Sequence, residues 1–313
     1  MQIPYFDAHC DTVSRMARFP GRHLDHRTGQ WDLNRLERFT GPKAQFFAIF
    51  YDSALPGKHQ AVKMQLAAFQ RECQRQPDRI ALCTTAQAAE EAFRQGRLAA
   101  FLSVEGAELL DCSLEQLQWA YAQGVRGVNL TWNHANALSG SHKDQPDRGL
   151  SEQGRAFVVK MGELGMLVDV SHLSDPGFWD VMEYASGPVM ASHSNSRDVF
   201  FHTRNLTDSQ FTAIIEKHGI VGLNCYTAFL GDGKVTMDTL LRHLEHYLSL
   251  GGEKTVALGG DWDGCDKLPR GFEGSWNWLD FYEYLLKRNY PEALLQDLYF
   301  NNLMRTVRAV CTI

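Results

Sequence analysis

The sequence predicts a single α/β domain over residues 1–313: a (β/α)8 barrel of the TIM type with additional C-terminal helices. Eight short apolar segments alternate with helical patterns, which is the signature of a parallel β/α architecture. Polar residues suited to metal binding follow several of these segments directly. The length suits one barrel domain, and no linker rich in Pro, Gly or Ser marks a second domain.

The predicted strands are short runs of apolar and aromatic residues. They are expected at residues 3–6, 44–51, 98–104, 125–130, 166–170, 188–191, 220–225 and 255–258. The polar residues 15–38 are expected to form a long loop at the mouth of the barrel, with His23 and His26 exposed in it.

Helical patterns separate these strands, and Gly96, Gly124 and Gly165 are placed to end three of the helices. Helices are expected at residues 61–75, 84–95, 113–124, 151–164, 175–185, 207–219 and 237–250. Residues 276–310 predict two more helices, separated near Pro291.

Composition excludes some classes of function. A net charge of −6 and the lack of a Lys/Arg cluster argue against a nucleic-acid partner. Seven scattered cysteines without a C-x-x-C pair indicate free thiols in a reducing compartment. No apolar run has membrane-spanning length, and the N-terminal residues do not resemble a secretory leader. We therefore expect a cytoplasmic protein without a membrane partner.

The first candidate site is the stretch FDAHCDT, where His9 and Asp11 follow a predicted strand. Residues two apart on a strand share a face, so the imidazole and the carboxylate lie together and Cys10 points away. Such a pair suits zinc, manganese or cobalt. An isolated His-x-Asp is common by chance, and it gains weight here because similar residues recur at later strand ends.

Six candidate ligands lie at or after the carboxyl ends of predicted strands, which share one rim in a parallel barrel. They are His9, Asp11, Glu105, His172, His193 and Asp261. Six is too many for one tetrahedral zinc with an open position and suits two ions. Hydrolytic metal pairs share a bridging ligand and water, and Glu105, lying between the two groups in the chain, is the predicted bridge.

The first ion is then expected to take His9, Asp11 and Asp261, and the second His172 and His193. A bridging water, acidified to a pKa of about 7 or lower, becomes a hydroxide nucleophile. Asp261 could receive its proton and pass it to the leaving group.

Six stretches together resemble the renal (membrane) dipeptidase family, zinc peptidases of the amidohydrolase superfamily. They are FDAHCDT, SVEGAE, VDVSHLSD, VMASHSNSR, HTRNLTD and ALGGDWDG, in the right order from about residue 3 to residue 266. The resemblance implies two zinc ions, with the bridging and ligand roles given above and Asp261 handling the proton. It also implies that Arg204 holds the substrate's C-terminal carboxylate through its planar guanidinium fork. A homodimer is a further implication.

One motif departs from that family, whose Leu-Thr-His carries an imidazole that helps to bind substrate and to stabilise the oxyanion. Here the stretch is Leu130-Thr131-Trp132. His134 lies about 6–7 Å further along an extended chain and could substitute, while Trp132 could equally form a wall of the substrate pocket. Loss of one oxyanion donor costs about a hundredfold or more in rate.

Three other residues could be mistaken for ligands. His243 and His246 lie three apart on a predicted helix outside the barrel, without the H-E-x-x-H order, and are expected on a solvated face. Asp263 is a second choice to Asp261, which follows its strand more directly.

The leading hypothesis is a dinuclear zinc dipeptidase, and the family resemblance extends the possible substrates to dipeptides with a C-terminal D-residue. Two alternatives stay open: hydrolysis of another amide or ester at the same site, and a non-catalytic metal- or ligand-binding barrel. The complete ligand set argues against the second.

Overall fold

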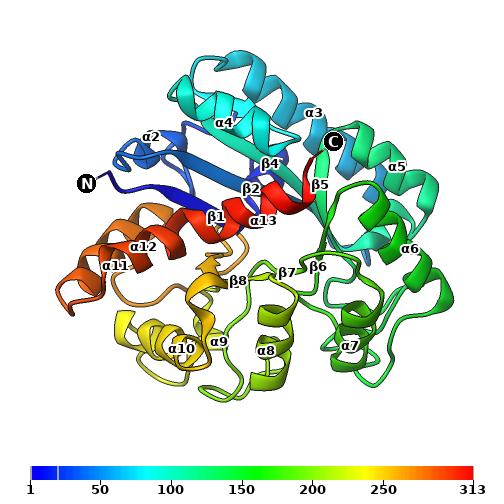
Figure 1. Ribbon diagram of the computed structural model, residues 1–313. Coiled ribbons are helices and arrows are strands. Elements are labelled where there is room, and N and C mark those ends of the chain that lie inside the picture. Colours follow the sequence, from blue (N-terminus) through cyan, green and yellow to red (C-terminus); the bar gives the residue numbers. More distant parts are fainter. Residues whose placement is uncertain (1, 20, 313) are drawn as a thin grey trace.

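The computed structural model describes residues 2–19 and 21–312, and within these ranges the core is a closed parallel barrel (Figure 1). Eight strands close it in the order β2-β1-β9-β8-β7-β6-β5-β4, with β2 pairing back onto β4. Their bounds are β1 Tyr5–Cys10, β2 Lys43–Phe50, β4 Leu98–Glu105, β5 Val125–Asn129, β6 Leu167–Asp169, β7 Met190–Ala191, β8 Ile220–Leu223 and β9 Val256–Leu258. The predicted (β/α)8 barrel is confirmed.

A further strand, β3 (Ile80–Leu82), lies outside the barrel and escaped prediction. It pairs with Leu98–Ala100 at the start of β4, and β5 takes over as the neighbour from Leu102 onward. Its three residues are too short for a recognisable apolar run, and pairing on one side alone keeps it in place.

The connecting helices occur where the sequence predicts them. They are α3 Lys58–Arg75, α4 Ala86–Arg94, α5 Leu114–Ala122, α6 Glu152–Glu163, α7 Asp175–Tyr184, α8 Asp208–Glu216 and α10 Met237–Ser249. Several begin at a Ser or Thr whose side chain accepts a hydrogen bond from the N–H three residues on, as at Thr85, Ser151 and Thr207. Short helices α9 (Thr227–Leu230), η1 (Ala107–Leu110) and η2 (Gly252–Lys254) lie in the loops.

The expected long loop at residues 15–38 is wrong in part, because α1 (Thr12–Arg18) and α2 (Leu33–Leu36) occupy its ends. The charged residues of this stretch conceal its buried apolar positions, among them Leu24 and Trp31. His23 is also less free than expected, since its Nδ1 lies 2.5 Å from Oε1 of the buried Glu72.

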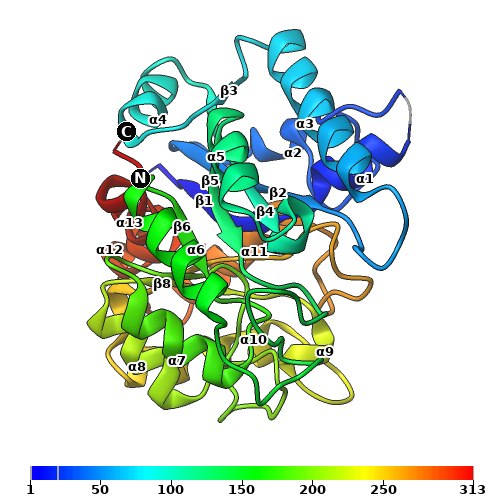
Figure 2. The ribbon, with the colours of Figure 1, turned by 90° about the vertical axis from the view of Figure 1, so that its right-hand side faces the viewer.

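The C-terminal helices follow β9. They are η3 Ser275–Asn277, α11 Trp278–Leu286, α12 Glu292–Gln296, a π-helical turn at Asp297–Asn301 and α13 Asn302–Val310. The last of them, the π-helical turn and α13, close the end of the barrel opposite to the strand ends (Figure 2). Phe300, Leu303 and Met304 pack in one cluster with Phe6 and Phe46 of the strands. In Figure 2, α12 and α13 lie on the left and α1 and α9 on the right, at opposite ends of the barrel. The carboxyl ends of the strands are therefore left for a site.

A bulge in β1 aims the first candidate ligands. The pairing of β1 with β2 shifts between Asp7 and Cys10, so that β1 carries one extra residue there. Phe6 and Ala8 belong to the cluster inside the barrel, whereas Cys10 belongs to the cluster outside it. His9 and Cys10 therefore point to opposite sides of the strand, as predicted, and the bulge is the reason.

All seven cysteines are free thiols, as predicted. Among residues 2–19 and 21–312, no helix is both long and apolar enough to cross a membrane.

Candidate metal centre

The structure brings the six predicted ligands together at the carboxyl rim of the barrel. His9 lies in β1, Glu105 ends β4, and the others follow strands β1, β6, β7 and β9 within three residues. All six side chains are buried: His9, Asp11, Glu105, His172, His193 and Asp261. Segments separated by some 250 positions in the chain therefore meet, as the sequence predicts.

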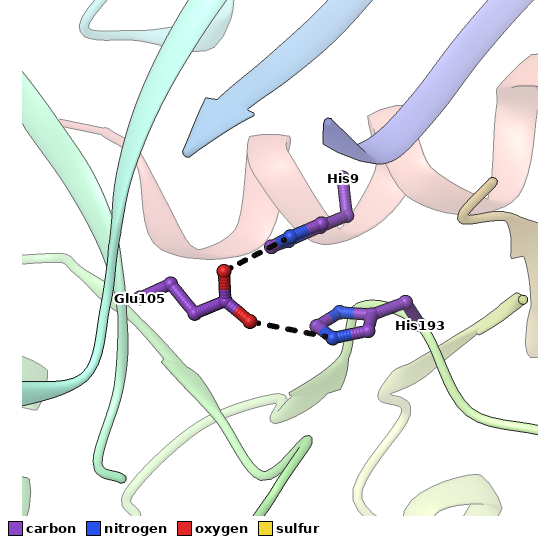
Figure 3. A group of neighbouring side chains, drawn as sticks. All are labelled: His9, Glu105 and His193. Atoms are coloured by element: carbon purple, nitrogen blue, oxygen red, sulfur yellow. Dashed lines mark ion pairs between the residues drawn. The ribbon is translucent and has the colours of Figure 1, made fainter. Parts of the chain in front are cut away.

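Glu105 lies between two groups of these side chains. Its Oε2 is 3.5 Å from Nε2 of His9, and its Oε1 is 2.9 Å from Nε2 of His172 and 3.6 Å from Nε2 of His193. Figure 3 shows His9 and His193 pointing at different oxygens of the same carboxylate. This is the arrangement that a bridging carboxylate needs.

Donor atoms converge on both sides of Glu105. On one side, Nε2 of His9 is 3.6 Å from Oδ2 of Asp11 and 3.9 Å from Oδ1 of Asp261. On the other, Nε2 of His172 and Nε2 of His193 are 3.0 Å apart. Two overlapping triads, His9–Asp11–Asp261 and His9–Glu105–His193, have donor atoms within 4.8 Å of one another.

These residues fit divalent metal ions. Both ring nitrogens of His9 and Oδ1 of Asp11 are buried without a hydrogen-bond partner among the described residues. Leaving such groups unpaired costs about 1–3 kcal/mol each, so a ligand that uses them is favoured. Imidazole and carboxylate donors together are the ligands that zinc prefers.

The electrostatics of the cluster also favour a cation. Burial, with the nearby charge of Asp11, raises the pKa of Glu105 to about 7. Burial likewise raises the pKa of Asp261 to about 6, although His9 opposes the change. Burial lowers the pKa of His172 and His193 well below the usual value, so they are neutral and keep a lone pair. A cation bound beside Glu105 and Asp261 would therefore favour the ionised form of both carboxyl groups.

Neighbouring side chains orient the imidazoles of two candidate ligands. Nδ1 of His193 is 2.7 Å from Oγ of Ser192, and Nδ1 of His172 is 3.1 Å from Oδ1 of Asn133. Both contacts leave Nε2 directed at Glu105. His172 and Asp261 also have positive φ angles of 72° and 59°, an uncommon backbone conformation that often marks functional sites.

Sequence reasoning missed two buried acids beneath the ligands. Asp7 accepts hydrogen bonds from the backbone N–H groups of His9 and Gly260 and from the indole N–H groups of Trp262 and Trp278. Asp169 accepts from the N–H groups that precede the two ligand histidines, those of Ser171 and Ser192. Asp7 lies within FDAHCDT, but its partners come from distant segments and leave no local signal.

A cavity of about 340 Å³ opens onto the cluster. Glu105, His172 and Asp261 lie at its base, and aromatic walls come from Phe50, Trp132, Tyr226 and Phe229. Trp132 lines the cavity, which is the second of the two roles that the sequence suggested for this stretch.

His134 does not line this cavity. Its side chain is 45% exposed, and its Nε2 is 3.6 Å from Oδ1 of Asp52. The extended spacing that suggested it as a substitute for the missing imidazole therefore does not bring it to the ligands. Asn133, the residue between Trp132 and His134, lines the cavity instead, and sequence reasoning overlooked it.

Arg204 is buried behind His193. Its Nη2 donates to the carbonyl oxygen of His193 at 3.2 Å, and its Nε has no hydrogen-bond partner within the described chain. Burial lowers the pKa of this guanidinium to about 10, and the nearby Asp261 and Glu105 oppose the change.

The residues set aside as alternatives have other partners. Asp263 accepts from Oγ1 of Thr12 at 2.8 Å and from the backbone N–H of Gln30 at 2.9 Å, and it pairs with Arg15. The solvated face expected for His243 is wrong, because this residue is fully buried. Its Nδ1 accepts from the N–H of Ser196, and its Nε2 donates to the carbonyl of Leu230. His246 pairs with Asp208.

A (β/α)8 barrel with buried histidines and carboxylates gathered at its carboxyl rim is typical of metal-dependent hydrolases. Within that class, the chain belongs to the membrane dipeptidase family, peptidase family M19, whose family model matches residues 1–313. The protein is accordingly a metallopeptidase of the dipeptidase type, and the resemblance given by the motifs is confirmed.

Comparisons with individual proteins agree with this family assignment. The chain is 34% identical over 257 residues to an uncharacterized protein in the pqqA 5' region of Klebsiella pneumoniae, covering 79% of this chain and 94% of that protein. A metallopeptidase from Rhodobacter sphaeroides, solved with a phosphinate mimic of the dipeptide L-Ala-D-Ala, is 28% identical with a TM-score of 0.90, covering 99% of this chain and 100% of that one. The structure of dipeptidase AC gives the same identity and TM-score over 100% of both chains.

Proposed function

We propose that this protein hydrolyses the amide bond of dipeptides with two zinc ions held at the barrel rim. The observation that carries the proposal is the position of Glu105, whose two oxygens face different groups of ligands. In this assignment His9, Asp11 and Asp261 hold one ion, His172 and His193 hold the other, and Glu105 bridges them. When bound, such a pair supplies Lewis acidity that acidifies water and polarises a carbonyl.

The chain's own residues perform the remaining tasks. Asp261 accepts a proton from the attacking water at a carboxylate oxygen and passes it to the nitrogen of the leaving amine. Its other oxygen, Oδ2, is fixed by Nδ2 of Asn224 at 3.2 Å. The aromatic cavity walls exclude water from the bond that breaks.

Arg204 is proposed to bind the free carboxylate of the dipeptide. Support comes from its buried, partly unpaired guanidinium beside the ligand His193, since a buried cation of this kind favours an anionic partner. The R. sphaeroides relative was solved with a mimic of L-Ala-D-Ala, which supports a small dipeptide, including one with a C-terminal D-residue, as substrate. The cytoplasmic location and the homodimer stay predictions.

The test is a dipeptide library that varies the configuration of each residue, assayed on protein of known metal content. Elemental analysis should give close to two zinc ions per chain, as the paired ligand groups require. Chelation should abolish turnover and added zinc should restore it. A zinc-replete protein that leaves every dipeptide intact would refute the proposal.

A second candidate is hydrolysis of another amide or of an ester at the same site. It is favoured by Trp132, which stands where the family carries an imidazole and narrows the cavity beside Phe50, with ring centroids 5.0 Å apart. Turnover of a lactone or a non-peptide amide, without turnover of dipeptides, would select it.

A further inference from the structure

We propose that Asn133 is a catalytic residue that donates a hydrogen bond from Nδ2 to the scissile carbonyl oxygen as that oxygen gains negative charge. The inference rests on the proposed function and concerns the task that a histidine performs elsewhere in the family. It assigns that task to the residue after Trp132, and to neither Trp132 nor His134.

The oxygen of the Asn133 side-chain amide already has two hydrogen-bond partners. Oδ1 of Asn133 lies 3.1 Å from Nδ1 of His172 and 2.8 Å from Nε2 of His142. A carbonyl oxygen only accepts, so both ring nitrogens must carry protons and donate to it. His172 then has its lone pair on Nε2, which faces Glu105 at 2.9 Å.

A cation held by Nε2 of His172 would require this orientation of the amide. With the amide reversed, its NH₂ group would meet Nδ1 of His172 and move that ring's proton to Nε2. His172 could not then bind a cation through Nε2. The same contact that keeps His172 competent as a ligand therefore directs Nδ2 of Asn133 away from both imidazoles.

The other end of the amide, Nδ2, is a free donor in the cavity that opens onto the candidate ligands. Asn133 lines the same cavity as His172, Glu105 and Asp261. Across the described parts of the chain, no side chain or backbone oxygen accepts a hydrogen bond from this NH₂ group, and it is not buried from solvent. A donor of this kind, next to paired metal ligands, suits an oxygen on which charge develops.

Asn133 is also held in position by its neighbours. A donor contributes most to catalysis when it is preorganised in this way. The backbone oxygen of Asn133 accepts from Oγ of Ser141 at 2.8 Å. His142, the partner of its side chain, contacts Thr203 through Nδ1 at 2.9 Å and donates its backbone N–H to the carbonyl of His172 at 2.8 Å. Asn133 is thus fixed at its backbone oxygen by Ser141 and at its amide oxygen by two imidazoles before a substrate enters.

The test compares variants of Asn133 in the zinc-loaded enzyme. Asn133→Asp keeps an acceptor for both imidazoles and removes the donor, but it adds charge. Asn133→Ala removes the donor without adding charge, and excess zinc compensates for weaker support of His172. We expect kcat for L-Ala-D-Ala to fall about a hundredfold or more in both, with KM changed only a few-fold. Affinity for a phosphinate mimic of this dipeptide, measured by calorimetry, should fall by a similar factor.

Two control variants separate Asn133 from its neighbours. Trp132→Phe removes the indole N–H and keeps an aromatic wall, and His134→Ala removes the imidazole outside the cavity. His134→Ala should retain kcat within a few-fold, and Trp132→Phe should lose less kcat than either Asn133 variant. Zinc content is measured for every variant, so that loss of metal is not read as loss of the donor.

Three results would overturn the inference. One is that both Asn133 variants keep the wild-type kcat and the wild-type affinity for the phosphinate. Another is that excess zinc fully restores the kcat of Asn133→Ala, which would make Asn133 a positioning residue for His172. The third is a loss in Trp132→Phe that exceeds the loss in the Asn133 variants. An inactive, zinc-replete wild type would instead refute the proposed function, so the two failures are distinguishable.

Discussion

Replacing Asp7 with asparagine should destabilise the protein and weaken its hold on metal together. The carboxylate of Asp7 joins β1 to the loop after β9. Its Oδ1 accepts from the N–H of His9 at 3.0 Å, and its Oδ2 accepts from Gly260 at 3.1 Å and from the indoles of Trp262 and Trp278 at 2.8 and 2.9 Å. His9 is itself a proposed ligand, and Gly260 and Trp262 flank another, Asp261.

The size of the effect follows from these contacts. The NH₂ group of asparagine disrupts the fewest hydrogen bonds when it takes the place of Oδ1. There it leaves the buried N–H of His9 without an acceptor, which lowers the free energy of unfolding by about 1–3 kcal/mol. The other three bonds then go to a neutral oxygen and lose about 0.5–1 kcal/mol each. Burial raises the pKa of Asp7, which means that its charge is costly in this position. Removing that charge offsets part of the loss. We expect a net loss of about 2–4 kcal/mol in the free energy of unfolding.

The assay is denaturant unfolding of the zinc-free protein, followed by zinc titration. Zinc affinity of Asp7→Asn should fall about 10- to 100-fold, the usual effect of losing a group that supports a ligand. Asp147→Asn, at an exposed position, serves as the matched control. If Asp7→Asn unfolds within about 0.5 kcal/mol of the wild type, the range of an ordinary surface substitution, and keeps its zinc, the reasoning fails.

Three further predictions follow from the same geometry. Zinc affinity should rise with pH, because zinc must displace protons from Glu105 and Asp261, whose pKa values are raised to about 7 and about 6. It must also displace a proton from His9: burial opposes protonation of this ring, but Glu105 and Asp11 raise its pKa well above the usual value. Below pH 6 we expect a loss of about tenfold or more per pH unit in a titration, and no slope would refute these shifts. Arg204→Ala should raise KM for free dipeptides about tenfold or more and spare C-terminally amidated ones, whereas equal effects on both would remove Arg204 from carboxylate binding. Glu105→Gln should lower the zinc content to one ion or fewer, because a neutral amide bridges ions poorly; two retained ions would exclude bridging.

The fold and the ligand cluster could be predicted from sequence because both depend on local patterns. Predicted strands such as 44–51 are nearly continuous apolar runs, and each candidate ligand lies at or shortly after the end of such a run. In a parallel barrel all those ends share one rim, so the convergence of His9 with Asp261 needed no knowledge of distances. β3 was missed for the opposite reason, since only its pairing with β4 distinguishes it from a loop.

The supporting contacts could not be predicted, because they depend on where separate loops meet. Asn133 contacts a histidine 39 positions further along the chain, and Asp7 contacts indoles more than 250 positions away. His134 shows the limit of an argument from spacing. Its extended distance from Trp132 is favourable, but its loop carries it toward Asp52 and away from the cavity.

The metal cluster and the barrel also depend on each other energetically. Three buried carboxylates and three imidazoles, some without hydrogen-bond partners, oppose folding when no cation is bound. The positive φ angles of His172 and Asp261 add to that cost. Asp7 and Asp169 partly offset it by fixing the backbone beneath the ligands, so the site keeps its shape before metal arrives. Zinc should therefore raise the unfolding temperature of the wild type more than that of Asp7→Asn, in which this preformed support is weakened.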